Sequence, residues 1–365
     1  MARFAAACAV AVGVLALCRG AGADTTITVA ADGSGAFTTV QAAIDAVPAN
    51  NTQRVIISIA PGTYQEQLTV PSDKPLVTFL GQDPDTTILT YDLNANSPKT
   101  GGGTVGTTGS TSTSIKADDF IAENITFANS TPDDVAQAVA IKTEGDRLIF
   151  RNCRFLGWQD TLYANRGSGP GRQYYTDCYI EGDVDYIFGN GRAYFDGCEV
   201  KTKEGGHVTA QSKDDPNLYS GYVFHDCQLT RAAAAGNNSS DLGRPWRGFA
   251  TVIYDSCWMD AHIKAVGWTH WNDAYSGDFS TAYYAEYIST GPGASPAGRA
   301  TWSHQLTAEE VEAYSLANWL GGDDNWNPIP EPGTASMVML GIAAMVRRRR
   351  RQRGSQRSQS RGRTQ

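Results

Sequence analysis

The chain has 365 residues, of which 41% are hydrophobic and 10% aromatic, enough for one large folded domain. Eleven of its 30 lysines and arginines lie in residues 1–23 and 333–365. The central part therefore has 19 basic residues against all 38 acidic ones, a balance of −19, while the whole chain carries −8. This acidity argues against nucleic-acid binding, and a polyanionic ligand would be bound best through its neutralised stretches.

Residues 1–23 have the pattern of a secretory signal peptide. Arg3 gives a positive start, residues 5–18 are apolar, and the small residues at 21–23 precede Asp24. The apolar run is too short and too rich in small residues for a transmembrane anchor. We therefore expect that signal peptidase removes this segment and that the protein is exported.

A strand over residues 25–30 and a short amphipathic helix are predicted at the start of the mature chain. The apolar residues of this helix follow helical spacing: Val40, Ala43, Ile44 and Val47. Between residues 55 and 287, short segments rich in Val, Ile, Phe, Tyr and Thr lack helical periodicity and predict strands.

A repeated motif runs through the strand region: a small, mostly polar residue, then a cysteine, then an apolar residue two positions on. Its copies contain Cys153, Cys178, Cys198, Cys227 and Cys257, at spacings of 25, 20, 29 and 30. Residues 124–127 (Asn-Ile-Thr-Phe) form an earlier copy without the cysteine. Such a repeat predicts an all-β solenoid with one coil per repeat, whose open end the helix near residue 40 covers.

Five cysteines remain after the signal peptide is removed, an odd number for an exported protein. We expect them to form an interior ladder of small apolar side chains. Cys178 and Cys198 are the candidates for a disulfide, because they occupy neighbouring coils. No metal site is expected, since the sequence lacks Cys-x-x-Cys and paired-histidine spacings.

Asp160 and Asp185 each lie seven residues after a cysteine, Cys153 and Cys178 respectively. In a parallel β-helix, residues at the same phase of adjacent coils stack at about 4.8 Å. Two carboxylates at that distance cannot comfortably both be ionised, so the pKa of one should rise. One aspartate can then act as an acid while the other remains an anion.

Two polar segments, residues 100–114 and 231–241, predict long loops that form the walls of a binding site. Further along, Thr307-x-x-Glu310 is a capping box that predicts a helix extending to about Leu320. We expect a single globular domain over residues 24–327.

Residues 328–365 form a three-part tail. A proline-rich spacer precedes a 13-residue, mostly apolar run over 334–346 and five arginines at 347–351. The apolar run is too short to span a bilayer unaided. This end, with Pro-Glu-Pro at 330–332, resembles the bacterial Pro-Glu-Pro sorting signal. The resemblance implies processing by a membrane-bound sorting protease and a protein that is secreted or associated with the cell envelope.

Five motifs occur in consistent order over residues 25–320: Gly62-x-Tyr64-x-Glu66, Gln137-Ala-Val-Ala140, Gly157-Trp-Gln-Asp-Thr-Leu-Tyr163, Gly182-Asp-Val-Asp-Tyr-Ile-Phe-Gly-Asn190 and Leu242-Gly-Arg-Pro-Trp246. Together they resemble the pectin methylesterase family. The resemblance implies a right-handed parallel β-helix that removes methyl groups from pectin, without a cofactor. Tyr186 replaces the commoner Phe and Trp158 a common Tyr, and neither change removes a chemical group that the reaction needs.

The resemblance also implies roles for individual residues. Asp185 would be the nucleophile and Asp160 the general acid, later the base. Gln137 and Gln159 would donate hydrogen bonds to the oxyanion, and Arg244 would hold Asp185 ionised. Substrate binding would involve Trp246, Thr107, Gln137 and Arg244.

The chemistry of these groups supports the same roles. An arginine fork keeps a weak carboxylate nucleophile charged and aimed, and neutral amides stabilise an oxyanion without titrating. We interpret Tyr64 and Glu66 as structural, and Asp183 as a solvated turn residue. The five histidines share no spacing and Gly-x-Ser-x-Gly is absent from the sequence, so a serine-hydrolase triad is unsupported.

Three alternatives remain open. A β-helix lyase or polygalacturonase would need a calcium site or carboxylates placed around a glycosidic bond, which this residue set matches poorly. A non-catalytic carbohydrate-binding solenoid is a second alternative, disfavoured by the intact Asp160, Asp185 and Arg244. The third is an esterase of this fold that acts on another ester or thioester. Nothing in the sequence indicates an oligomer, so we expect a monomer.

Overall fold

The computed structural model describes residues 24–133, 135–271 and 280–329. It separates into two compact units, one ending at Val311 and one starting at Glu312, and each is described by itself. The expected signal peptide and nearly all of the expected sorting tail lie outside the described residues. Within the described part, no helix is long and apolar enough to cross a membrane.

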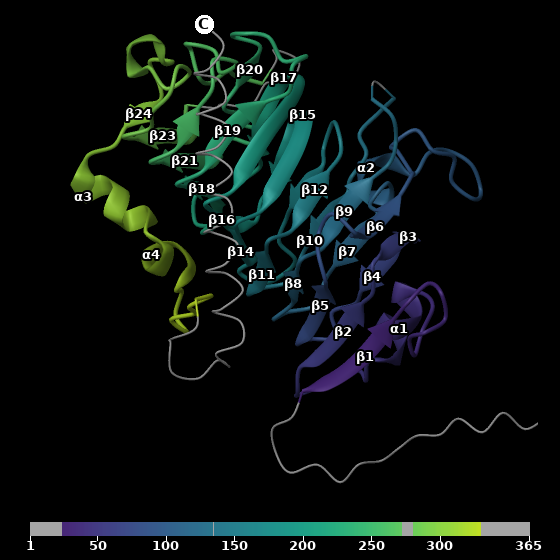
Figure 1. Ribbon diagram of the computed structural model, residues 1–365. Coiled ribbons are helices and arrows are strands. Elements are labelled where there is room, and N and C mark those ends of the chain that lie inside the picture. Colours follow the sequence, from purple (N-terminus) through teal and green to yellow (C-terminus); the bar gives the residue numbers. More distant parts are fainter. Residues whose placement is uncertain (1–23, 134, 272–279, 330–365) are drawn as a thin grey trace, which may run out of the picture. The chain divides into compact units, whose positions relative to one another are not determined.

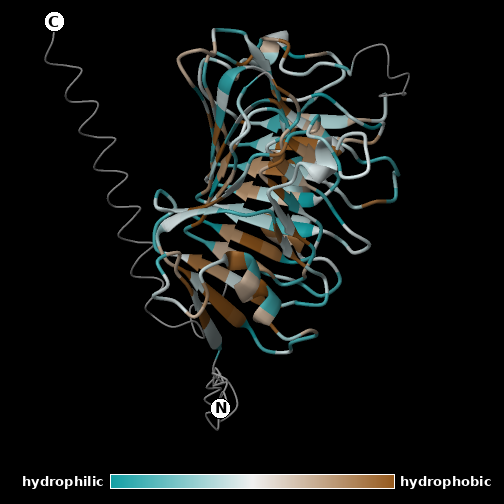
Figure 2. Cartoon of the chain, turned by 90° about the vertical axis from the view of Figure 1, so that its right-hand side faces the viewer, coloured by the Kyte–Doolittle hydropathy of each residue, from teal (hydrophilic) through white to brown (hydrophobic). Residues whose placement is uncertain are grey.

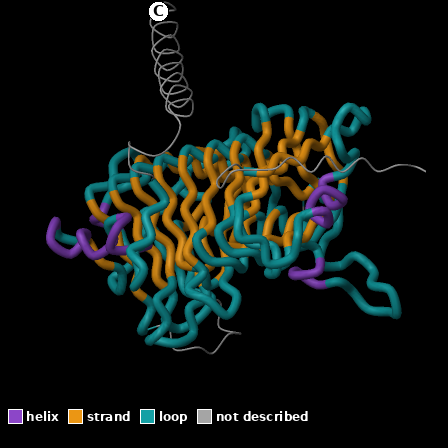
Figure 3. The backbone as a smooth tube through the Cα atoms, turned by 90° about the horizontal axis from the view of Figure 1, so that it is seen from below, coloured by secondary structure: helices purple, strands orange, loops and turns teal. Residues whose placement is uncertain are grey.

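The first unit is a right-handed parallel β-helix, as predicted, with strands stacked coil upon coil (Figures 1 and 3). One sheet contains a single strand from each coil, and every neighbouring pair in it is parallel. Its strands, in spatial order, are β1 (Thr25–Val29), β2 (Val55–Ile59), β5 (Val77–Gly81), β8 (Ile121–Glu123), β11 (Leu148–Arg151), β14 (Arg172–Thr176), β16 (Arg192–Asp196), β18 (Gly221–His225), β21 (Thr251–Asp255), β23 (Tyr283–Tyr287) and β24 (His304–Gln305).

The second sheet supplies two further faces of the solenoid, joined through two long strands, β15 (Tyr179–Gly189) and β17 (Glu199–Gln211). One face also contains β3 (Gly62–Gln65), β6 (Thr87–Tyr91), β9 (Thr126–Asn129), β12 (Arg154–Leu156), β19 (Gln228–Arg231) and β22 (Trp258–Met259). The other contains β4 (Leu68–Val70), β7 (Thr113–Ile115), β10 (Ile141–Thr143), β13 (Leu162–Ala164) and β20 (Ser240–Asp241).

The small residue of each repeat occupies a left-handed turn between two faces. Its φ is positive in six consecutive coils, at Asn124, Asn152, Asp177, Gly197, Asp226 and Ser256 (48–61°). Asn, Asp and Gly tolerate this region better than other residues because of their short polar side chains or missing Cβ. The repeat seen in the sequence therefore corresponds to the left-handed turn that recurs once in each coil.

The strands of the solenoid are rich in hydrophobic residues (Figure 2), and in the interior side chains of one kind stack from coil to coil. Phe150, Tyr175, Phe195, Phe224 and Tyr254 form a column of parallel rings with centroids 4.5–4.8 Å apart. That distance equals the spacing of neighbouring strands, because residues in register on adjacent strands are separated by the strand spacing. All five rings are fully buried.

The cysteines form the predicted interior ladder but no disulfide. All five thiols are free and buried. Cys178 Sγ donates to Phe150 O at 3.5 Å and Cys198 Sγ to Tyr175 O at 3.5 Å, so both thiols are used by backbone carbonyls. The expected Cys178–Cys198 disulfide was wrong, because stacked side chains point in the same direction at the strand spacing, wider than the usual Cβ separation of a disulfide (about 3.8 Å).

The first coil is closed by α1 (Val40–Ala46), whose Val40, Ala43 and Ile44 are buried in the core. Its N-terminus is capped from outside the helix, because the Glu66 carboxylate accepts hydrogen bonds from the amides of Val40 (2.8 Å) and Gln41 (3.1 Å). This capping satisfies two donors that a helix start leaves unpaired. Glu66 is thus structural, as interpreted from the sequence.

Two sequence-based boundaries need correction. The loop expected over residues 100–114 contains the short helix α2 (Gly106–Gly109) and the start of β7. The capping box at Thr307 and Glu310 forms and opens α3 (Ala308–Val311). The helix then does not continue to residue 320. A 3₁₀ turn (Glu312–Tyr314) and an extended Ser315 separate α3 from α4 (Leu316–Leu320).

Candidate active site

The candidate site lies on the outer side of the face formed by β4, β7, β10, β13 and the C-terminal part of β15, hereafter the site face. Strand alternation decides which side chains point outward: in β13, Leu162 and Ala164 are fully buried whereas Tyr163 is partly exposed. β13 and β15 pair in parallel with Leu162 opposite Ile187. The same register of 25 residues puts Asp160 and Asp185 at one phase of adjacent coils, as predicted.

Asp185 is held by a two-pronged ion pair with Arg244. Arg244 Nε donates to Oδ1 of Asp185 at 3.0 Å, and Nη2 donates to Oδ2 at 2.7 Å. The Asp185 side chain is 6% exposed and the Arg244 side chain 18%. Such a fork favours the ionised carboxylate and fixes its orientation.

Asp160 is in a different electrostatic state. Burial raises the pKa of Asp160 well above its ordinary value, and the nearby negative charges of Asp185 and Asp183 raise it further, against an opposing effect of Arg244. Both Asp160 (φ 65°) and Asp185 (φ 51°) have left-handed backbones, which fixes where their side chains leave the coil. The pair therefore combines a carboxyl group whose pKa is raised with a carboxylate held in an arginine fork, an asymmetry that suits acid–base chemistry.

Backbone pairing with β17 positions the segment that carries Arg244. The amide of Arg244 donates to Thr209 O, and that of Trp246 to Gln211 O, both at 3.0 Å. Gly243 passes so close to Thr209 that a Cβ would collide with it. Because Gly243 has no side chain, this segment can run close to β17, which places Arg244 within reach of Asp185.

Aromatic side chains continue from the aspartates along the site face. Tyr163 stacks on Phe188 (centroids 4.2 Å apart), and Phe188 lies 6.1 Å from Trp246. Trp271 stacks near Trp246 at 6.4 Å and lies 3.9 Å below the Arg244 guanidinium. Flat apolar rings with a few polar groups are typical of a ligand-binding surface.

Gln137 and Gln159 lie side by side in adjacent coils, because Ala138 N donates to Gln159 O at 3.1 Å. Both glutamines are partly exposed. Within the described residues, neither side-chain amide has a hydrogen-bond partner, so both are available to a ligand next to Asp160.

Thr107 lies in α2 and is connected by hydrogen bonds to the segment that carries Gln137. The Ser110 hydroxyl donates to Thr107 O at 2.6 Å and accepts a hydrogen bond from Val139 N at 3.1 Å. Gln137 O in turn accepts from Ala95 N, at the base of the loop. These bonds tie the loop that carries Thr107 to the segment that carries Gln137.

The two departures from the family pattern are accommodated. The Tyr186 hydroxyl is buried and hydrogen bonds with Thr202 Oγ1 at 3.1 Å. Trp158 is covered by Lys203, whose Nζ is 3.2 Å from the ring centroid. Asp183, interpreted as a solvated turn residue, is instead half-buried in β15, and burial raises its pKa.

Sequence reasoning missed three aromatic residues of the site face: Tyr163, Phe188 and Trp271. Tyr163 and Phe188 are 25 residues apart, the spacing of Asp160 and Asp185, so the repeat itself could have identified them. No motif marks Trp271. Among the described residues, no cluster of three or more His, Cys, Asp or Glu side chains could hold a metal ion.

Comparison with known proteins gives a consistent family. Residues 26–323 match the family model described as Pectinesterase. Pectinesterase 31 of Arabidopsis thaliana is 43% identical over 260 residues, which cover 69% of this chain and 78% of that protein. The chain spans about half the length (45–53%) of several other curated plant relatives.

Solved structures agree. Pectin methylesterase from carrot superimposes with a TM-score of 0.76 at 30% identity, covering 84% of this chain and 96% of that one. A crystal structure of pectin methylesterase in complex with a hexasaccharide superimposes with a TM-score of 0.71 at 27% identity, covering 84% and 98%.

Proposed function

This chain belongs to the pectinesterase family, and we propose that it hydrolyses the methyl esters of polygalacturonate to pectate and methanol through Asp185 and Asp160. The observation that carries this proposal is the asymmetry of the pair. Both carboxylate oxygens of Asp185 accept hydrogen bonds from the Arg244 fork, while Asp160, one coil away, has a raised pKa. A nucleophile and a proton donor therefore stand at neighbouring positions.

In the first half of the reaction, an oxygen of Asp185 attacks the ester carbonyl carbon. Each carboxylate oxygen has lone pairs beyond the one that accepts from Arg244, so the fork does not block attack. The side-chain amides of Gln137 and Gln159 donate to the oxyanion of the tetrahedral intermediate. When this intermediate collapses, Asp160 gives its proton to the leaving methoxide, and methanol departs.

The second half regenerates the enzyme. Asp160, now ionised, takes a proton from a water molecule, and the resulting hydroxide attacks the carbonyl of the acyl-enzyme. Collapse of this intermediate releases the galacturonate carboxyl group and restores the Asp185 carboxylate. Asp160 ends the cycle protonated, so atoms and charge balance without a cofactor.

A polymeric uronate is supported as substrate by the site face and by the comparisons. The partly exposed rings of Tyr163, Trp246 and Trp271, which pack against the buried Phe188, offer flat surfaces for sugar units. The structural neighbour in complex with a hexasaccharide is a pectin methylesterase. We propose that Trp246 and Thr107 contact sugar units on either side of the reacting ester.

The test is methanol release from highly methylated pectin by the full chain, with Asp185→Ala as the inactive control. Methanol from the wild type and none from the variant supports the aspartyl esterase. Uronide cleavage without methanol would assign the chain to a lyase or glycosidase instead. No reaction on pectin would indicate an esterase for another ester or a carbohydrate-binding solenoid.

We further propose that residues 1–23 are removed by signal peptidase and that the tail over 328–365 directs sorting to the cell envelope or the medium. The apolar run, the Pro-Glu-Pro at 330–332 and the arginine block support this. Intact mass measurement of the protein from a host with a Pro-Glu-Pro sorting protease should give an N-terminus at Asp24 and loss of the arginines. A mass that retains both ends contradicts the proposal.

A further inference from the structure

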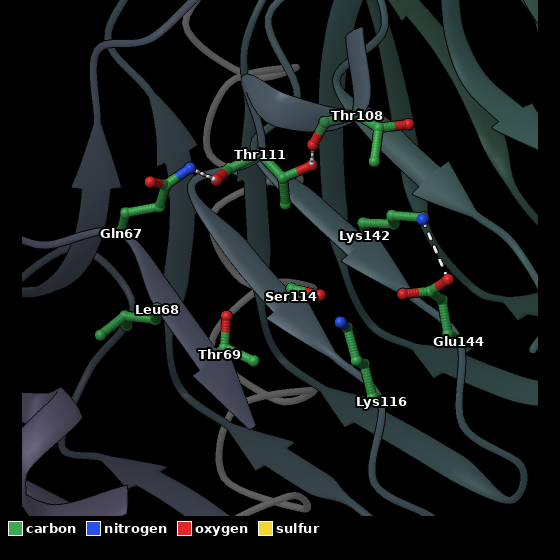
Figure 4. A pocket seen from close by; sticks show the side chains of 9 residues that line it. All are labelled: Gln67, Leu68, Thr69, Thr108, Thr111, Ser114, Lys116, Lys142 and Glu144. Atoms are coloured by element: carbon green, nitrogen blue, oxygen red, sulfur yellow. Dashed lines mark hydrogen bonds and ion pairs between the residues drawn. The ribbon is translucent and has the colours of Figure 1, made fainter. Parts of the chain in front are cut away.

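The catalytic aspartates lie between two polar features of the same solenoid face. On the N-terminal side is a pocket of about 260 Å³, with Lys116, Lys142 and Glu144 among its lining residues (Figure 4). On the C-terminal side is β20, which contains a carboxylate that the proposed reaction does not use. This carboxylate belongs to Asp241, three residues before Arg244, and its side chain is 0% exposed.

Three side chains from two other coils meet at one oxygen of Asp241. His207, in the preceding coil, pairs with Asp241 in the register of β17 and β20, and its Nδ1 lies 2.9 Å from Oδ2 of Asp241. This contact has the distance of an ion pair without the alignment of a hydrogen bond. From the following coil, Lys264 Nζ donates to the same oxygen at 3.3 Å and Thr269 Oγ1 at 3.2 Å. Asp241 therefore joins three consecutive coils at one buried point.

The negative charge of Asp241 strengthens these contacts. Burial alone raises the pKa of Asp241, but its contacts with His207 and Lys264 outweigh burial and lower this pKa below the ordinary value. The ionised form is thus favoured, and a carboxylate accepts stronger hydrogen bonds than a neutral amide of the same shape. Replacing Asp241 by asparagine should therefore loosen the cluster while keeping its volume.

The backbone next to Asp241 leads directly to Arg244. The carbonyl oxygen of Leu242 accepts hydrogen bonds from Thr209 Oγ1 at 2.9 Å and from the Tyr254 hydroxyl at 3.0 Å. The amide of Arg244 then donates to Thr209 O at 3.0 Å. Side-chain contacts at Asp241 and backbone contacts at Leu242 thus fix the segment from which the guanidinium extends.

The coil that follows carries the ring that lies against this guanidinium. Thr269, which donates its hydroxyl to Asp241, also donates its amide to Gly243 O at 3.3 Å. Two residues further along the chain, Trp271 lies 3.9 Å from the Arg244 guanidinium. Asp241 therefore connects the segment that carries the guanidinium with the segment that carries the ring packed on it.

We propose that Asp241 is a positioning residue for the esterase reaction, whose buried carboxylate keeps the Arg244 and Trp271 segments in the alignment that aims the carboxylate of Asp185. The inference rests on the proposed function. A displacement of about 1 Å at a reacting group can cost about 100-fold in rate. Because Asp241 acts through Arg244, its loss should lower kcat more than it raises KM.

The test measures methanol release from methylated pectin and thermal unfolding for the full chain and its Asp241→Asn variant. We expect kcat of the folded variant to fall about tenfold, with KM changed by less than about twofold. Asp146→Asn is the matched control, because Asp146 is also buried and paired, with Arg172 at 2.7 Å, but precedes β11 in the other sheet. The control should lower Tm and keep the wild-type kcat.

Combination with Arg244→Lys separates positioning from a general weakening of the fold. If Asp241 acts through the fork, Asp241→Asn should lower kcat far less in the Arg244→Lys background, where the fork is already absent. Thr269→Val supplies a milder variant that folds even where Asp241→Asn does not, because it removes one donor to Asp241 and keeps the shape of the side chain. Its kcat should fall about threefold, the effect of one hydrogen bond.

Three results overturn the proposal: an equal fall in kcat in Asp146→Asn, an equal fall caused by Asp241→Asn in both backgrounds, or wild-type kcat in Thr269→Val. Absence of methanol with the wild-type protein would instead overturn the proposed function, so the two failures are distinguishable.

Discussion

Arg244 and Asp185 are 59 residues apart in the chain, yet Nε and Nη2 of the guanidinium each donate to a different oxygen of the carboxylate. The two donors lie in one plane with a fixed separation, so they set the direction of the carboxylate as well as its charge. Because the solenoid brings the Arg244 segment alongside β17, the fork is a product of coil register.

Arg244→Lys tests this geometry because it keeps the charge and removes the fork. We expect kcat for methanol release to fall at least about 100-fold with a smaller change in KM, since a single ammonium cannot orient both oxygens. Arg231→Lys, in the Arg231–Asp260 pair (3.1 Å), is the matched control and should keep wild-type kcat. Wild-type activity in Arg244→Lys would show that charge alone suffices.

Asp160→Asn removes the proton donor. We expect kcat to fall by at least about 100-fold, because neither methoxide protonation nor water activation can occur. In the wild type, kcat/KM should decline as pH rises through the raised pKa of Asp160. Asp183→Asn should shift this alkaline limb to lower pH, since the Asp183 charge helps to raise the pKa of Asp160. An unshifted limb would assign it to another group.

Although Asp160→Asn should abolish most of the activity, we expect it to increase the stability of the fold. The folded state holds a proton on Asp160 that the unfolded chain releases above a pKa of about 3.9. The wild type therefore loses stability as pH rises from that value through the raised folded pKa. Urea unfolding should show Asp160→Asn to be more stable than the wild type at pH 7, with the difference shrinking toward pH 4. A variant less stable at pH 7 contradicts the buried, neutral Asp160.

The repeat in the sequence was sufficient to predict the solenoid and the pairing of the two aspartates. The left-handed corners are occupied by Asn, Asp, Gly or Ser, so these residue types recur once in each coil from Asn124 to Ser256. Once the corners are aligned, Asp160 and Asp185 fall at one phase. The prediction of a helix near residue 40 succeeded for a similar reason, since its buried side chains repeat at helical spacing.

The predictions that were wrong, and the residues that were missed, concern contacts that produce no periodic pattern in the sequence. The Cys178 side chain points toward Phe150 O and its thiol remains free. The spacing of the cysteines in the sequence does not show this direction. The break at Ser315 arises in a segment too short for periodicity to resolve. Trp271 reaches Arg244 and Trp246 by the path of a loop, and the pocket around Lys116 requires three coils to be superimposed before its residues meet.

His262 should make the fold sensitive to acid. The ring is fully buried, neither nitrogen has a hydrogen-bond partner among the described residues, and burial lowers the pKa to about 4. The unfolded chain binds a proton near pH 6.5, so stability is full above that pH and is lost as pH falls toward 4. Between pH 7 and 5 the wild type should lose about 2 kcal/mol through this residue. Urea unfolding of His262→Leu should show a correspondingly smaller loss, and an equal loss would contradict the prediction.

Ile288 occupies the corner position after Ser256. β21 and β23 pair with Asp255 opposite Tyr287, so Ile288 follows Ser256 by one coil, and it too has a positive φ (36°). A β-branched residue is strained there, and Ile288 is 64% exposed, so packing does not compensate. Ile288→Asn should therefore stabilise the protein by about 1 kcal/mol, seen as a higher Tm.

Ile288→Val is the control for this last prediction, because valine keeps the β-branch and should leave Tm near the wild-type value. Ile288→Gly separates strain from side-chain hydrogen bonding, since glycine relieves the strain but adds freedom to the unfolded chain. The expected order of Tm is Asn above Gly and Gly above Ile. A lower Tm for Asn than for Val would mean that exposed contacts of the isoleucine outweigh the strained corner.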